Sequence, residues 1–196
     1  MKNHPTVVDI QHFGLKALST ACVKSENKVM MGKAGGIPVV VKSMRDNPKH
    51  VDIQLYGCWA LSAAAVNDDN ETLVGKEGGL DVIVAAMRGH PDNQEIQHRG
   101  CRALANSCSQ VNNKSVAARA GAIEAILGGM RRHPGNLDVQ LYGTWALTSI
   151  AWSASDLQSK VKAAGAVEVV RKAMSDFSNN AQLQEKGNQL MGKLGK

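Results

Sequence analysis

The stretch IQLYGCWALSAAA, Ile53–Ala65, decides the fold, because it returns almost unchanged as VQLYGTWALTSIA, Val139–Ala151. Both copies place apolar residues three and four apart, the spacing that gives an α-helix one apolar face. Each copy also holds a glycine inside the expected helix, where glycine costs about 1 kcal/mol relative to alanine. A glycine kept at one place in similar helices predicts close backbone approach between packed helices.

The repeat has a period of 43 residues and runs along the whole chain. Proline recurs at Pro5, Pro48, Pro91 and Pro134, and a glutamine, a glycine and an Ala-Leu pair follow each proline at constant distances. One residue is inserted before Gly165, after which the frame continues to Gln184 and Gly187. The other periodic positions are Gln11, Gln54, Gln97 and Gln140; Gly14, Gly57, Gly100 and Gly143; Gly35, Gly78, Gly121 and Gly165; and Met44, Met87, Met130 and Met174.

Each unit predicts three helices and no strand. A long helix follows the proline, as over 51–66, and a short helix, as over 71–77, ends at two glycines. A helix of intermediate length, as over 80–88, has a clear apolar face and stops at the next Gly-His-Pro. All-helical periods of about 40–47 residues are typical of armadillo and HEAT arrays.

The motif AGGIPVVVKSM, Ala34–Met44, followed by the IQLYGCWAL motif resembles the armadillo repeat, and the resemblance covers the whole chain. It implies an all-α fold, a right-handed α-solenoid in which a short helix and two longer ones stack in each unit. The long helix after the proline corresponds to the third helix of an armadillo unit. HEAT units lack the short helix and the Gly-Gly joint, so they are the second choice.

In the armadillo frame we expect a single array over 1–196. Residues 1–47 form a partial first repeat that starts at its third helix, near 6–23; 48–90, 91–133 and 134–177 are repeat units from proline to proline; and 178–196 carry a terminal third helix. Array ends cut within a unit leave apolar faces to be covered. The chain is therefore also readable as a segment of a longer array, or as one that self-associates through its ends without a groove ligand.

Composition bounds the classes of function. The chain is 43% hydrophobic and 20% charged, which is ordinary for a globular protein. Its net charge of +6 is spread among 17 acidic residues, so nucleic acid is not the expected partner. No apolar run is long enough for a membrane span, and no signal peptide or lipidation motif is present. Four cysteines without paired spacing indicate a reducing compartment, so we expect the cytoplasm, the nucleus or both.

The resemblance also implies a binding site. In armadillo proteins that bind extended peptides, such as importin alpha, the third helices line a concave groove and carry the motif WALxN, in which the tryptophan stacks on the ligand and the asparagine bonds its backbone. The matching tryptophan positions here are Lys16, Trp59, Arg102, Trp145 and Gln189; the asparagine positions are Thr20, Ala63, Asn106, Ser149 and Lys193; and the positions one turn earlier are Phe13, Tyr56, Arg99, Tyr142 and Lys186.

The chain departs from the importin pattern in two ways. Only Asn106 keeps the amide, which counts against a continuous asparagine ladder. Aromatic and cationic units also alternate: Tyr56 and Trp59 on one helix, Arg99 and Arg102 on the next, Tyr142 and Trp145 on the third. We therefore predict a protein partner that offers an extended, acidic peptide, with the arginines pairing to carboxylates and the rings stacking. In sign this is closer to the groove of beta-catenin.

Catalytic and metal sites are not expected. His90 and His133 stand before prolines and are interpreted as turn residues, while His12 and His98 take helix positions that leucine fills in other units. No cysteine is paired with a base, so a nucleophile has no support. The GKAGG and GKEGG stretches lack the spacing of a phosphate loop. We predict no enzyme activity, no cofactor and no metal.

Overall fold

The structure, a computed structural model, describes residues 1–152 and 154–195. These residues form thirteen α-helices and no strand. The helices are α1 (Val8–Ala21), α2 (Ser25–Lys33), α3 (Gly36–Asp46), α4 (Val51–Ala64), α5 (Asp68–Lys76), α6 (Gly79–Gly89), α7 (Gln94–Ser107), α8 (Val111–Ala120), α9 (Ala122–Arg132), α10 (Leu137–Ala151), α11 (Ser155–Ala163), α12 (Ala166–Asp176) and α13 (Ala181–Lys193).

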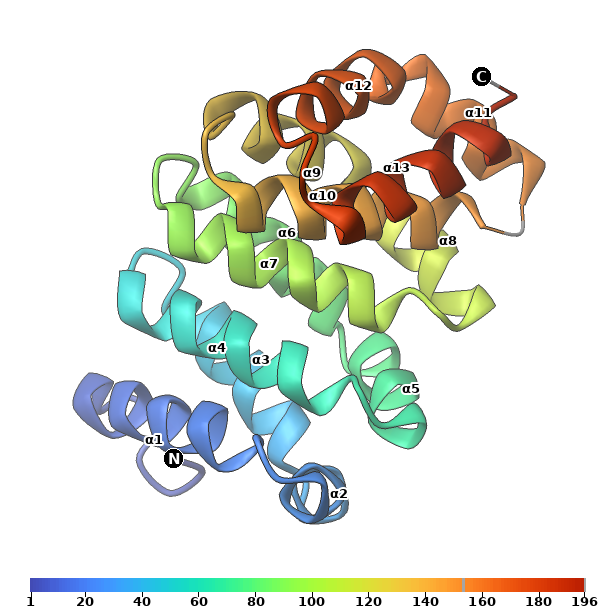
Figure 1. Ribbon diagram of the computed structural model, residues 1–196. Helices are drawn as coiled ribbons and strands as arrows, with labels where there is room; N and C mark the ends of the chain where they lie inside the picture. Colours follow the sequence, from blue (N-terminus) through green and yellow to red (C-terminus); the bar gives the residue numbers. More distant parts are fainter. Residues whose placement is uncertain (153, 196) are drawn as a thin grey trace.

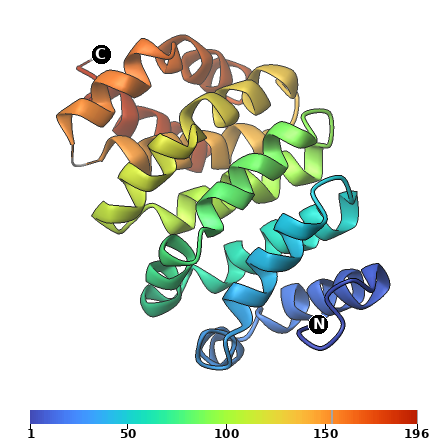
Figure 2. The same cartoon turned by 180° about the vertical axis from the view of Figure 1, so that it is seen from behind.

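The helices stack in layers, with the chain ends at opposite ends of the stack. The third helices α1, α4, α7, α10 and α13 lie side by side on the face seen in Figure 1. The helices of intermediate length, α3, α6, α9 and α12, form the opposite layer, which Figure 2 shows from behind. The short helices α2, α5, α8 and α11 run along one edge. The observed helix ends differ from the sequence expectations by at most about three residues.

A periodic glutamine closes each unit. Gln54 Nε2 donates to Met44 O at 2.9 Å and to Asn47 O at 2.8 Å, so one amide ties the end of α3 to the turn that leads into α4. The same pair of bonds is made by Gln11, Gln97, Gln140 and Gln184. Buried carbonyl groups need such donors, because an unpaired buried polar group is costly. The glutamine period therefore marks the turn before each third helix.

The glycine inside each third helix receives a methionine. A Cβ added at Gly100 would lie 2.5 Å from Met87 Cγ, closer than real Cβ contacts allow. Gly57, Gly143 and Gly187 face Met44, Met130 and Met174 in the same way, and Gly14 faces Met1. The prediction of close approach between two helix backbones is therefore wrong at these sites, because each glycine makes room for a methionine side chain instead. Met1 completes the methionine period, a position that the sequence reading did not include.

Further bonds join one unit to the next. Asn70 Nδ2 donates to Lys28 O at 2.7 Å, and Asn113 Nδ2 donates to Glu71 O at 2.9 Å. Leu157 occupies the same repeat position as Asn70 and Asn113, so the last junction between units has leucine in place of asparagine. The Glu71 carboxylate is buried and accepts from the backbone N–H groups of Ser109 at 2.8 Å and Gln110 at 2.7 Å, which fixes the turn that leads into α8.

Turn residues behave as their spacing predicted. The glycines between the short and intermediate helices, Gly35, Gly78, Gly121 and Gly165, have φ values of 69° to 84°, which favour glycine. His90 Nε2 lies 2.9 Å from Pro48 O, and His133 Nε2 lies 2.7 Å from Pro91 O, so both histidines link successive turns. At the first end of the stack, Val23 and Met30 are 73% and 65% exposed.

Candidate functional site: an aromatic and cationic ladder on the third helices

The predicted groove residues lie on neighbouring third helices, on the surface that we call the groove face. It is defined by the thirteen predicted side chains. Ten of these are half-buried, whereas those of α1 are exposed: Phe13 has 61% of its surface free. The half-buried residues are Tyr56, Trp59, Arg99, Arg102, Asn106, Tyr142, Trp145, Ser149, Lys186 and Gln189, and the exposed residues are Phe13, Lys16 and Thr20.

The first part of the groove face joins α1, α4 and α7 through rings and cations. His12 stacks on Tyr56 with ring centroids 5.6 Å apart, and the Tyr56 and Trp59 rings are 6.3 Å apart. Lys16 Nζ lies 5.7 Å from the centroid of Tyr56, and Arg99 Cζ lies 4.3 Å from that of Trp59. Each cation therefore comes from a helix next to the one that carries the ring.

The second part repeats this arrangement on α7, α10 and α13. Arg102 Cζ lies 5.3 Å from the Tyr142 centroid, and the Tyr142 and Trp145 rings are 6.1 Å apart. Lys186 Nζ lies 5.2 Å from the Trp145 centroid. Cation–π contacts of this kind contribute about 0.5–1 kcal/mol when exposed and more when desolvated. The alternation seen along the sequence is thus a continuous ladder across the helices.

Stacking fixes the arginines while leaving donors at their edges. A guanidinium that lies over a ring keeps its five N–H groups in its own plane. Arg99 Nη2 lies 3.7 Å from Glu95 Oε2 on the same helix, and Arg99 Nε is buried with no hydrogen-bond partner among the described residues. Arg99 is therefore oriented and only partly neutralised.

The asparagine positions are used inside the array. Asn106 Nδ2 donates to Ser62 O on α4 at 2.9 Å, and Ser149 Oγ donates to Ala105 O on α7 at 3.4 Å. Thr20 Oγ1 donates to Lys16 O and Ala17 O within α1. These hydroxyl protons and one Asn106 N–H thus serve neighbouring backbone, and a ligand backbone would meet the remaining amide groups of Asn106.

Two histidines extend the ladder at the side where the third helices begin. His98 is buried and stacks on Tyr142 at 5.2 Å, and its Nδ1 lies 3.9 Å from Asp138 Oδ2. Burial lowers the pKa of His98, the Arg99 charge acts in the same direction, and Asp138 opposes both. His12 Nε2 lies 3.9 Å from Asp52 Oδ2 in the equivalent place.

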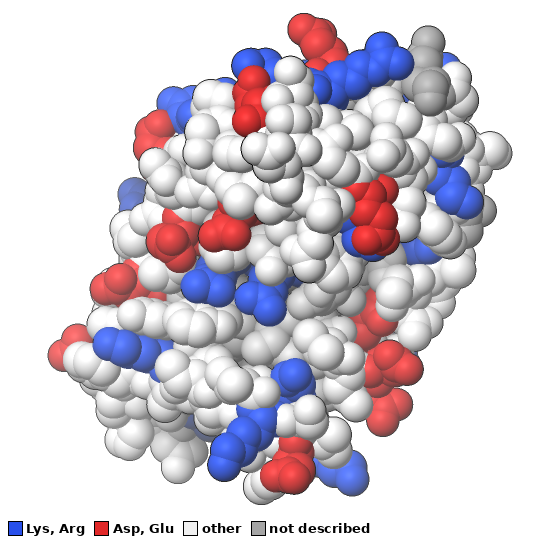
Figure 3. Space-filling view, viewed as in Figure 1, with Lys and Arg blue, Asp and Glu red and all other residues white. Residues whose placement is uncertain are grey.

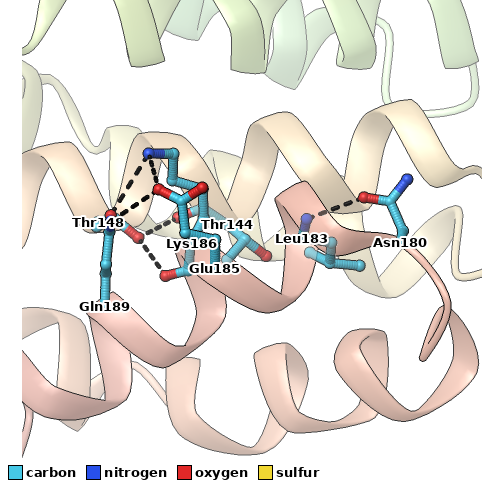
Figure 4. Close-up of polar contacts among 7 residues, drawn as sticks. All are labelled: Thr144, Thr148, Asn180, Leu183, Glu185, Lys186 and Gln189. Carbon is cyan, nitrogen blue, oxygen red and sulfur yellow. Dashed lines mark hydrogen bonds and ion pairs between the residues drawn. The ribbon is translucent and has the colours of Figure 1, made fainter.

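Lys186 and Gln189 end the ladder in a small polar cluster (Figure 4). Lys186 Nζ lies 3.2 Å from Glu185 Oε1 and 3.5 Å from Gln189 Oε1, and Gln189 Nε2 donates to Glu185 Oε1 at 3.0 Å. Thr148 Oγ1 donates to Lys186 O at 3.1 Å, which joins α10 to α13. The Lys186 ammonium is thus held at the groove face beside one carboxylate.

Two clefts open on the groove face, and Trp145 lines both of them. The central cleft, of about 430 Å³, includes the predicted residues Arg102, Asn106, Tyr142, Trp145 and Ser149. The C-terminal cleft, of about 390 Å³, includes Trp145, Ser149, Lys186 and Gln189. The side chains of Phe13, Lys16, Thr20, Tyr56, Trp59 and Arg99 line neither cleft.

Sequence reasoning missed several cleft residues. Trp152 is 47% exposed and lines the C-terminal cleft together with Lys114 and Ser109. Its spacing of seven residues from Trp145, two helical turns, was the signal that could have found it. Lys114 carried no such signal, because it comes from α8, which the predicted groove did not include. Asp68 and Glu71 of the central cleft were missed for the same reason, because they come from α5.

Charge on this face is mixed but ordered. Figure 3 shows Lys and Arg side chains near its centre and Asp and Glu side chains mostly to either side.

Cys58, Cys101 and Cys108 are buried thiols, and burial raises the pKa of each to about 12, so they are neutral and not nucleophilic. Among the described residues, no helix has the length and apolar character that a membrane crossing requires.

Known structures resemble this fold closely. The crystal structure of an engineered protein matches with a TM-score of 0.80 at 21% identity, covering 96% of this chain and 76% of its own. A second engineered protein gives 0.81 at 24% identity, covering 97% and 75%. A designed armadillo repeat protein in complex with the peptide (KR)4 gives 0.77 at 18% identity, covering 95% and 80%. These likenesses establish an armadillo-repeat α-solenoid.

The sequence itself identifies the family. A search of curated protein sequences finds no match to this chain. A family model described as LRRK2 ARM repeat matches residues 63–196, more than half of the chain. This stretch includes Arg99 and Arg102 of α7 and Trp145 of α10, whereas Trp59 of α4 lies just before it. The chain therefore belongs to the LRRK2 ARM repeat family of armadillo-repeat proteins.

Proposed function

We propose that this array is a protein-interaction scaffold that binds an extended, acidic peptide along the groove face. The observation that carries the proposal is the ladder in which Arg99, Arg102 and Lys186 each lie over a ring of a neighbouring helix. Rings and arginines are the residues in which interface energy concentrates. The armadillo fold is a scaffold type, and we propose no reaction for it.

The sign of the ligand follows from the groove residues of this chain. The designed armadillo relative is in complex with a basic peptide, (KR)4. On this groove face, Lys16, Arg99, Arg102 and Lys186 are cationic, and none of the thirteen predicted residues is acidic. An acidic ligand therefore complements the side chains here, whereas a basic one would meet the guanidinium groups.

The helix spacing sets the ligand length. Packed helices lie about 8–10 Å apart, and an extended chain advances about 3.3–3.6 Å per residue. Each third helix can therefore contact about two or three ligand residues. We expect a carboxylate beside Arg99 and Arg102, flanked by apolar or aromatic residues that contact the Tyr56–Trp59 and Tyr142–Trp145 pairs.

The test is a random-peptide selection on the wild-type protein, counter-screened against the double variant Trp59→Ala, Trp145→Ala. Acidic peptides with flanking aromatic residues should be enriched on the wild type and lost on the variant. A second variant, Arg99→Glu with Arg102→Glu, should reverse the preference in sign. Lys42→Gln with Lys172→Gln is the matched control, since both lysines are exposed and pair with an aspartate on their own helix. Identical peptides from the wild type and the tryptophan variant would contradict the proposal.

A second candidate is self-association of array ends with no groove ligand. The observation that favours self-association is a group of exposed apolar side chains at the first end of the stack. Val23 and Met30 there are largely exposed to solvent. Sedimentation velocity over a range of concentrations would detect it. A mass that rises with concentration, and that Met30→Glu returns to the monomer value, would support self-association; a constant mass would contradict it.

We also propose a cytoplasmic or nuclear location. Four cysteines are free and buried in the structure. A chain with buried thiols and no disulfide suits a reducing compartment. Fractionation of cells that express a tagged chain would test the location, and recovery in a secretory compartment would contradict it.

A further inference from the structure

The C-terminal cleft combines two aromatic walls with lysines. Trp145 and Trp152 are seven residues apart on and just after α10, a rise of about 10 Å along the helix, and both line the cleft. Lys186 Nζ lies 5.2 Å from the Trp145 ring and Lys193 Nζ lies 4.3 Å from the Trp152 ring. Lys186 therefore lines the cleft together with both rings, and Lys193 lies next to it over the Trp152 ring.

Charge in this cleft has one sign. Its lining among the described residues includes Lys114 and Lys186 and no carboxylate, whereas the central cleft has Arg102 together with Asp68 and Glu71. Lys114 is buried at the base, with 4% of its surface exposed. Cys108 is a neutral thiol because burial raises its pKa to about 12. Two carboxylates lie beside this lining: Glu185, which is well exposed and 3.2 Å from Lys186 Nζ, and Glu71, which accepts from the N–H of Ser109 at 2.8 Å.

The hydroxyl groups in the lining are already engaged. Thr148 Oγ1 donates to backbone carbonyls of Thr144 and Lys186, and Ser149 Oγ donates to Ala105 O. The N–H groups of Ser109 and Gln110, just before α8, donate to Glu71, so these two groups are not available to an anion. Recognition in the cleft therefore depends on the ammonium groups and the indole rings.

We propose that the C-terminal cleft binds a phosphorylated side chain of the peptide held on the groove face. The ammonium groups of Lys186 and Lys193 suit a phosphoester, which carries about −1.5 to −2 charges and three acceptor oxygens, better than a singly charged carboxylate. The proposal rests on the proposed peptide-binding function. It assigns a role to Trp152, which the predicted groove omitted, and to Lys193, which stands at the last of the predicted asparagine positions.

The direct experiment compares three peptides that differ at one residue. The probes are acetyl-Ala-Leu-Xaa-Leu-Ala-amide with glutamine, glutamate or phosphoserine as Xaa, and calorimetry measures their affinities. Phosphoserine should bind about ten-fold tighter than glutamate, as expected for additional charge-assisted hydrogen bonds. Lys186→Gln with Lys193→Gln, and separately Trp152→Ala, should remove this preference, and Lys42→Gln with Lys172→Gln should keep it.

The opposite outcomes are equally definite. Equal affinity of the three peptides for the wild type would overturn the phosphate site, as would a phosphoserine preference that survives in both cleft variants. Glu185→Gln should increase the preference, because it removes the carboxylate beside Lys186. Circular dichroism would check that each variant is folded, and the lysine variant keeps the test valid if Trp152→Ala unfolds.

A second readout separates failure of the cleft from failure of the groove. Phenyl phosphate needs no peptide groove, and NMR can follow the indole N–H signals of Trp59, Trp145 and Trp152 in one spectrum. Phenyl phosphate should shift the signals of Trp145 and Trp152 and leave that of Trp59 in place. If no peptide binds but these shifts occur, the peptide groove is wrong and the anion site stands. If peptides bind without the shifts and without a phosphoserine preference, the groove stands and the anion site is wrong.

Discussion

The interior between units and the groove face obey different rules, although the same third helices build both. Inside, every third helix has the same glutamine and the same glycine, and each glycine receives a methionine. On the groove face, one helix presents Tyr56 and Trp59 where the next presents Arg99 and Arg102. Positions that close the fold therefore keep one residue type, and positions on the groove face vary from unit to unit.

The cause is geometric. The glutamine must reach two carbonyl oxygens at fixed places, and no other uncharged side chain of its length supplies two N–H donors on one nitrogen. A groove position has only to contact a side chain on the next helix. A cation–ring contact forms equally well whichever of the two helices carries the cation. Interior exchanges should therefore change stability, and groove exchanges should change binding.

The largest effect is expected for Gly100→Val. The added side chain would collide with Met87 Cγ, 2.5 Å from the new Cβ, and Met87 is itself buried. Overpacking of this kind costs about 1–3 kcal/mol, and we expect the upper end. Urea unfolding followed by circular dichroism measures the loss. Gly128→Ala on α9 is the control, since nothing lies within 4 Å of its new Cβ; equal unfolding midpoints for the two variants would contradict the methionine contact.

The next effect is expected for Gln97→Leu. Removal of the amide leaves Met87 O and His90 O without their side-chain donor, and an unsatisfied buried group costs about 1–3 kcal/mol. We expect a destabilisation of about 2 kcal/mol by urea unfolding. Asn106→Ala, which removes one bond to Ser62 O on the groove face, should cost about half as much. A reversed order would break the distinction between interior and groove.

A smaller effect on stability, with a clear effect on binding, is expected for Arg99→Tyr combined with Arg102→Trp. This exchange gives α7 the pair found on α4 and α10. The unfolding free energy should change by less than about 1 kcal/mol, as for most partly exposed substitutions. The affinity for a selected acidic peptide should fall about ten-fold through loss of two charge-assisted pairings. Calorimetry measures the affinity; unchanged affinity would remove the arginines from the site.

The smallest effect concerns pH. Burial lowers the pKa of His98 in the folded state, so below the ordinary value the unfolded chain binds more protons than the folded one. The stability that neutral His98 provides is complete above the unfolded pKa of about 6.5 and is lost as the pH falls toward the folded pKa. Unfolding at pH 7.5 and pH 5.0 should show a smaller decrease in His98→Leu, which has the residue of Leu55 and Leu141. An equal decrease in the unfolding free energy of the wild type and the variant would contradict a role of His98 in the pH dependence.

Much of the fold was predictable because the period is written into residues that close each unit. Pro48 precedes α4 and Gly78 precedes α6, and both act through their own backbone conformation, which local sequence determines. The matching residues on neighbouring helices follow from the period alone. The order of the helices and the alternation of residue types on the groove face can therefore be predicted from the repeat spacing alone.

The groove details were less accessible because they depend on contacts between units. The bond from Asn106 to Ser62 O joins residues 44 apart, and nothing in either local sequence indicates that the amide is used internally. The stacking of Arg99 over Trp59 likewise depends on how α7 packs on α4. The inserted residue lengthens α10 to 15 residues, against 14 in α4 and α7, and Trp152 follows it directly, where the frame gives least help.

Met44, Met87 and Met130 each fill the space beside a glycine of the following third helix, which we call a glycine notch. These contacts also determine how the array responds to oxidants. Conversion of a thioether to a sulfoxide adds a polar oxygen to an apolar side chain. Met30, 65% exposed, can carry that oxygen in water, whereas Met44, Met87 and Met130 are buried against a glycine of the next helix and have no room for it. Oxidative damage should therefore begin harmlessly at Met30, and damage at a notch should separate a third helix from the intermediate helix before it.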